Sequence, residues 1–135
     1  MAYCDRADIE ARIGRDATAR LADIDMLGME DPDALPRAIT DAAADIDAAL
    51  GIRWPECIGQ TTPLLTRLAV DLAVGHLARG PQRTEEITER HEAAEKSLKA
   101  IAAGSIRPCG AAAVGGSVGD VQFAPGRRVF DGGIY

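Results

Sequence analysis

Aromatic residues are scarce in this chain, which has one Trp, two Tyr and two Phe among 135 residues. Apolar residues nevertheless make up 47% of the sequence. The core must therefore consist of Ala, Leu, Ile and Val, and such small side chains favour helices that lie close together. A chain of this length supplies a single hydrophobic core.

A basic excess and a long apolar run are also missing. The net charge of −6 argues against sequence-specific nucleic-acid binding, because phosphate neutralisation needs clustered Lys and Arg. No apolar run approaches the ~20 residues that span a bilayer. The start MAYCDRADIE does not resemble a signal peptide. We therefore expect no membrane partner and a protein that starts in a cytoplasm.

Closely spaced cysteines are absent as well. Cys4, Cys57 and Cys109 are an odd number, lie far apart and form no CxxC motif. The pattern supports neither a disulfide framework nor a zinc site, so we expect free thiols that are buried or half-buried.

Helical periodicity dominates the first hundred residues. We expect a first short helix over residues 7–12, which Gly14 ends, and then a second short helical piece over residues 16–23. Three further helices are expected over residues 33–51, 62–79 and 84–103. Asp5 is the expected N-cap of the first short helix, and Thr62 and Thr84 are those of the last two helices. The apolar surface of residues 62–79 is broad enough for a central helix. The prediction is an all-α bundle of about four helices, two of them short or medium, with a body over residues 1–104.

Acidic residues gather in two places. Within the loop of residues 23–33, Asp23, Asp25 and Gly28 fit the spacing of an EF-hand, but Leu27 replaces an oxygen ligand and Ala34 replaces the final Glu. We interpret the segment as an acidic surface loop. A second acidic group, Asp41, Asp45 and Asp47, is interpreted as the solvated face of its helix.

Motifs for catalysis are not found. The chain contains no phosphate-binding Gly-rich loop, GxSxG or HExxH. His76, near the broad face of the 62–79 helix, is interpreted as structural. We therefore expect no enzymatic activity, no cofactor and no metal ion.

The C-terminal segment, residues 105–135, is expected to be a flexible linker followed by an extended, partly strand-like arm. Residues 119–135, GDVQFAPGRRVFDGGIY, place two short apolar pieces around a Pro-Gly turn. The helical body offers these pieces no sheet, so we expect them to add to a strand edge of a partner. The alternative is an arm that folds back on its own helices or stays disordered.

Partner-binding residues are predicted in the arm and in the connector of residues 52–60. Trp54 lies before Pro55 and is either a hydrophobic lid over the helix ends or a contact for a neighbouring subunit. The predicted partner-binding residues are Arg53, Trp54, Val121, Phe123, Arg127, Arg128, Val129, Phe130 and Tyr135.

Four segments resemble, in order, those of the phage Mu Gp36-like family: AYCDRADIEARIG, DAAADIDAALGIRWP, TTPLLTRLAVDLAVGHL and RRVFDGG. The resemblance covers most of the chain and rests on order and spacing, because any capped helix would show each motif alone. The 23–33 loop departs from the family pattern with Met26, Leu27 and Met29.

This resemblance implies a head–tail connector, or adaptor, of a tailed phage. Its expected partners are the portal protein, the next neck, stopper or tail protein, and further copies of itself in a ring, expected to be a dodecamer. DNA would pass through the ring without sequence-specific binding. The expected location is the virion neck, with the host cytoplasm before assembly.

Two other functions stay open at this point. One is another neck component, a stopper or tail-completion protein, which would more often have a β-rich body. The other is a small non-virion regulatory protein built from helices, which would form a discrete small oligomer or bind one dedicated partner.

Overall fold

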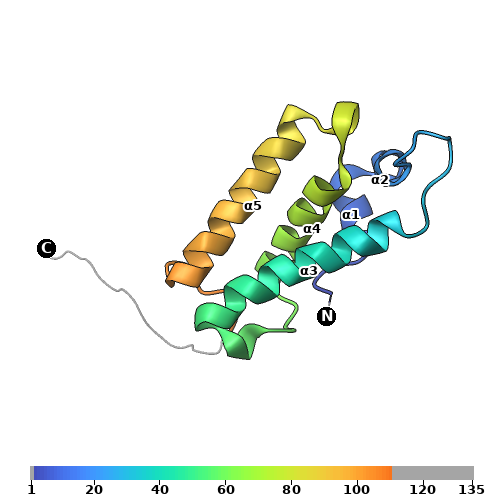
Figure 1. Cartoon of the computed structure of the whole chain (residues 1–135). Coiled ribbons are helices and arrows are strands. Elements are labelled where there is room, and N and C mark those ends of the chain that lie inside the picture. Colours follow the sequence, from blue (N-terminus) through green and yellow to red (C-terminus); the bar gives the residue numbers. More distant parts are fainter. Residues whose placement is uncertain (1, 111–135) are drawn as a thin grey trace, which may run out of the picture.

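The computed structural model describes residues 2–110 and shows five α-helices and no strand in that range (Figure 1). The helices are α1 (Arg6–Ile13), α2 (Arg15–Ala22), α3 (Ala34–Arg53), α4 (Pro63–Leu77) and α5 (Glu85–Ala103), with short 3-10 turns η1 (Pro55–Cys57) and η2 (Gly80–Gln82). The all-α prediction is confirmed, with five helices instead of about four. The expected strand-like arm lies outside the described residues.

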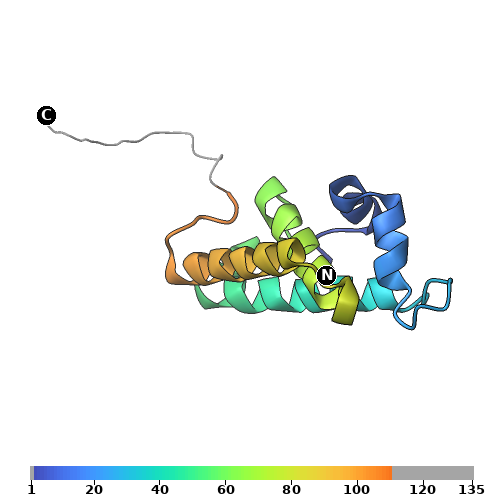
Figure 2. The ribbon, with the colours of Figure 1, turned by 90° about the horizontal axis from the view of Figure 1, so that it is seen from above.

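Helix α4 is the centre of the bundle, as its broad apolar surface predicts. It packs against α3, α5, α1 and α2, and α3 also packs against α5. The short helices α1 and α2 gather near the N-terminal end of α3 (Figures 1 and 2). None of the helices in residues 2–110 is long and apolar enough to cross a bilayer.

The helix boundaries follow from local capping. Asp5 forms a capping box with Asp8, and the hydroxyls of Thr62 and Thr84 accept the N–H groups three residues ahead. Gly104 ends α5 in the left-handed conformation, with φ of 92°, which glycine adopts without steric cost. These caps are where the sequence places them.

The end of α3 differs from the prediction. The helix continues through Gly51 to Arg53, and the N–H of Trp54 still donates to the carbonyl of Leu50 at 2.7 Å. A single interior glycine costs a helix only about 1 kcal/mol. The stop comes from Pro55, whose ring disfavours helical backbone in the residue before it.

Helices α4 and α5 approach closely at Gly75. An ideal Cβ on Gly75 would lie 1.9 Å from Nδ1 of His91, which is itself buried without a hydrogen-bond partner. The His91 ring also meets His76 edge to face, with ring centres 5.3 Å apart. Glycine at this position is therefore required by packing, because a methyl group would overlap the imidazole.

Gly75→Ala should lower the free energy of unfolding in the wild-type background. Overpacking costs about 1–3 kcal/mol, whereas Ala gains about 1 kcal/mol over Gly in a helix interior. In a His91→Ala background the overlap is gone, so the same change should stabilise the protein. Urea denaturation of the four variants tests this double-mutant cycle. Destabilisation of equal size in both backgrounds would show that His91 is not the obstacle.

Leu68→Ala and Leu72→Ala should each destabilise the fold by about 2–5 kcal/mol, since both side chains are buried in the α4 core. Ala93→Ser, at an exposed position on α5, is the matched control and should change little. Thermal unfolding followed by circular dichroism checks the ranking. Leucine variants as stable as the control would contradict the central position of α4.

Candidate partner-binding surfaces

The structure places only two of the nine predicted partner-binding residues. Arg53 and Trp54 lie at the C-terminal end of α3, beside the end of α5. The other seven, Val121, Phe123, Arg127, Arg128, Val129, Phe130 and Tyr135, lie outside the described residues. Their role stays a prediction.

Trp54 is engaged within the chain. Its Nε1 donates to the carbonyl oxygen of Ile101 at 2.8 Å, and the guanidinium carbon of Arg107 lies 5.7 Å from the ring centre. A cation at that distance is attracted to the face of the indole. The half-buried ring therefore joins the ends of α3 and α5, as a lid would. Arg53 remains exposed.

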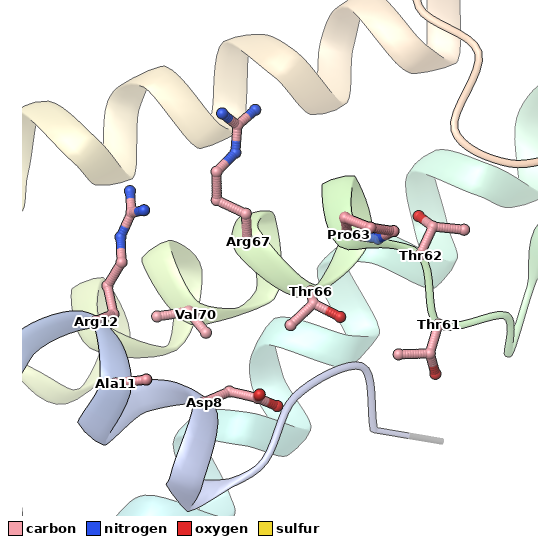
Figure 3. A pocket seen from close by; sticks show the side chains of 9 residues that line it. All are labelled: Asp8, Ala11, Arg12, Thr61, Thr62, Pro63, Thr66, Arg67 and Val70. Atoms are coloured by element: carbon pink, nitrogen blue, oxygen red, sulfur yellow. The ribbon is translucent and has the colours of Figure 1, made fainter.

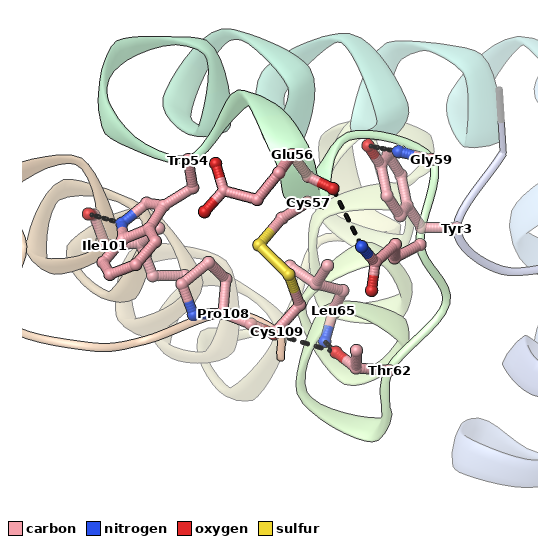
Figure 4. The surroundings of a disulfide bond; sticks show 11 residues. Tyr3, Trp54, Glu56, Cys57, Gly59, Thr62, Leu65, Ile101, Pro108 and Cys109 are labelled. Atoms are coloured by element: carbon pink, nitrogen blue, oxygen red, sulfur yellow. Dashed lines mark hydrogen bonds between the residues drawn. A yellow bond between two sulfur atoms is a disulfide. The ribbon is translucent and has the colours of Figure 1, made fainter. Parts of the chain in front are cut away.

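A disulfide lies next to this tryptophan. Cys57 in η1 and Cys109 are bonded, with their Cα atoms 5.8 Å apart (Figure 4). Cys4 is a buried free thiol. The expectation of three free thiols was wrong for this pair. The two cysteines are 52 residues apart in sequence, and only the fold brings them together.

The start of the expected flexible linker is part of the packed body. Pro108 and Cys109 are buried, and the hydroxyl of Thr62 donates to the carbonyl of Pro108 at 3.2 Å. The segment that follows α5 therefore passes across the N-terminal end of α4, where Thr62 contacts Pro108 (Figure 4). The arm leaves the body from an anchored point beside Trp54.

The unfolded, unreduced protein should react with Ellman's reagent at one thiol, and at three after reduction. Native Cys4 should react slowly, because burial raises its pKa to about 11 and disfavours the thiolate.

Removing the bridge with Cys57→Ala should lower the free energy of unfolding by about 2–4 kcal/mol under oxidising conditions. Cys4→Ala is the control for cysteine loss, and three reactive thiols without reduction would show that the bridge is absent.

Two of the three carboxylates on the face expected to be solvated have partners. Asp47 accepts a hydrogen bond from the hydroxyl of buried Tyr3, whose oxygen also accepts the N–H of Gly59 at 2.9 Å. Burial of the Tyr3 hydroxyl is the main cause that raises the pKa of Tyr3, and the hydrogen bond to Asp47 raises it further. Asp45 lies 2.7 Å from Nε2 of His76, which agrees with a structural role for that histidine.

An open groove lies between α1 and the start of α4 and has a volume of about 480 Å³. Arg12 and Arg67 project along it from the two helices, and Asp8 lies at its other end (Figure 3). Beside the groove, Arg12 forms an ion pair with Asp71 at 3.3 Å. Burial raises the pKa of Asp71, and the positive charges of the nearby arginines partly offset this rise. The groove is lined by threonine hydroxyls and by charged side chains of both signs, together with the apolar side chains of Ala11, Pro63 and Val70.

The 23–33 loop is built as an acidic surface loop. The carboxylate of Asp23 accepts the N–H groups of Leu27 and Gly28, each at 2.8 Å, so its oxygens are used to hold the turn. Within residues 2–110, no group of three or more His, Cys, Asp or Glu side chains is arranged to hold a metal ion. The loop exposes Met26, Leu27 and Met29.

A comparison with protein families gives a match over residues 3–115 to the family described as Bacteriophage Mu, Gp36. The chain belongs to the phage Mu Gp36 family. No curated protein sequence matches the chain significantly. The family match spans all five helices and the anchored segment that follows them.

Membership of the Gp36 family confirms the resemblance seen in the helical segments and identifies the chain as a phage protein. The match ends before RRVFDGG at residues 127–133. For the arm, the resemblance to Gp36-like ends stays a prediction from the sequence.

Proposed function

We propose that this protein is a structural component of the virion, a head–tail connector that forms a ring beneath the portal. In this role it provides the docking surface for the next neck or tail protein. The observation that carries the proposal is the Gp36 family match over the whole helical body. The location would be the virion neck, after assembly from subunits in the host cytoplasm.

The architecture supports a role in assembly. The body is a helical bundle with a bridge and a tryptophan contact at the point where the arm leaves. A fixed exit point restricts where the arm can reach, which lowers the entropy lost when it binds. The net charge of −6 also suits a ring through which DNA passes without being held. The proposed role requires no catalytic group.

The arm is proposed as the grip on the portal. Val121, Phe123, Val129 and Phe130 supply apolar contacts, and Arg127 and Arg128 follow the turn where they can reach acidic groups. A strand edge of the portal would satisfy the backbone N–H and C=O groups of the arm. Such pairing combines backbone affinity with side-chain specificity.

Deletion of residues 119–135 should leave a folded helical body that no longer attaches to DNA-filled heads. In infected cells, heads without tails should then accumulate, as counted by electron microscopy. Circular dichroism of the truncated protein controls for folding. A full-length variant with Val121, Phe123, Val129 and Phe130 changed to Ser should fail in the same way. Truncated protein that docks on heads with unchanged affinity would show that the helical body provides the grip.

A further inference from the structure

Two apolar surfaces are exposed at opposite ends of α3. The first, the loop patch, consists of Met26, Leu27 and Met29 in the loop before the helix, which are 65%, 78% and 76% exposed. The second, the end patch, consists of Ile52 and Ile58 at the end of the helix, which are 71% and 44% exposed. Helix α3 has 20 residues and is therefore about 30 Å long, with the loop at one end and the connector to α4 at the other (Figure 1).

The two ends carry opposite charge. Residues 23–33 contain five acidic residues and no basic one, and one of the five, Glu30, is paired with Arg6 of α1. At the end of α3, Arg53 and Arg107 are exposed, whereas Glu56 is the one carboxylate in residues 48–60 and residues 96–110 contain none. Arg107 lies over Trp54 and Arg53 lies beside the end of α5, so these cations surround one end of the bundle.

A hollow beside the loop patch adds concave apolar surface. It has a volume of about 630 Å³, and its apolar lining includes Ile13, Leu21, Met26, Pro81 and Ile87. Two hydrogen bonds to Asp23 hold the turn of the loop, and the ion pair of Glu30 with Arg6 at 2.8 Å joins the loop to α1. The loop patch therefore lies beside a concave surface with a partly apolar lining.

We infer that the loop patch of one copy binds the end patch of a second copy, head to tail. Charge decides between the possible pairings: a loop patch against a loop patch brings five acidic residues onto five, and two end patches bring cations together. Loop against end joins opposite charges and covers exposed apolar side chains of both copies. Because the two patches are different surfaces, a bound pair still has one loop patch and one end patch free, so the contact repeats and can close into a ring.

This inference rests on the proposed connector function, for which it names the contact between neighbouring subunits. Each copy would use the 23–33 loop toward one neighbour and the end of α3 toward the other. The arm starts beside the end patch, where Cys109 is bonded to Cys57. One of the two ring contacts and the start of the arm would therefore lie at the same end of the bundle.

Two full-length variants test the contact, because each removes one patch and keeps the other. Leu27→Asp disables the loop patch and Ile52→Asp disables the end patch. Both side chains are exposed, so circular dichroism and thermal unfolding should stay close to wild type. Each variant alone should show at least about tenfold weaker self-association by sedimentation velocity. Ala93→Asp, the same charge change on exposed α5, should associate like the wild type.

An equimolar mixture of the two variants gives the decisive result. One intact loop patch and one intact end patch remain per pair, so the mixture should form a dimer that grows no further. A mixture that stays monomeric, a variant that associates as strongly as wild type, or a wild type that is monomeric at every concentration would overturn the proposed contact.

Attachment to heads is measured separately, so the two proposals fail in different ways. Wild-type protein that assembles through the patches but never binds heads would contradict the connector function and leave the contact in place. Leu27→Asp protein that forms normal rings on heads would contradict the contact and leave the connector function in place.

Discussion

The burial of α4 by all the other helices is the constraint on which this fold depends. With almost no aromatic side chains to fill space, the core relies on Ala, Leu, Val and Ile, and the helices have to lie close together. Gly75 shows how close, since even a methyl group there would overlap His91 of α5. The long helices are held in this arrangement by shape more than by specific polar bonds.

Polar contacts are concentrated where the helices end. Tyr3 joins the N-terminal segment to Asp47 of α3 and to Gly59 of the connector, and Trp54 joins the end of α3 to the end of α5. The bridge between Cys57 and Cys109 closes the same end of the bundle. These contacts fix the last described residues of the chain to the end of the bundle, beside Trp54.

Much of the fold was predictable because its signals are local. Asp5, Thr62 and Thr84 each cap a helix through a hydrogen bond that reaches three residues along the chain, and the apolar stripe of α3 repeats with the helical period. The site was less predictable. Arg53 and Trp54 were identified from their residue types, but the contacts of Trp54 with Ile101 and Arg107 depend on residues about fifty positions away. The hydropathy pattern alone would not show Met26, Leu27 and Met29 to be exposed.

The sequence by itself determined the helical class, the positions of the helices, the caps and the family. Each of these depends on residues a few positions apart, where backbone geometry sets the neighbours. Only the tertiary structure decided that Cys57 pairs with Cys109, that Asp47 and Asp45 have buried or half-buried partners, and that residues 105–110 belong to the body. These contacts depend on how the helices cross, which the packing of the whole core decides and no local pattern specifies.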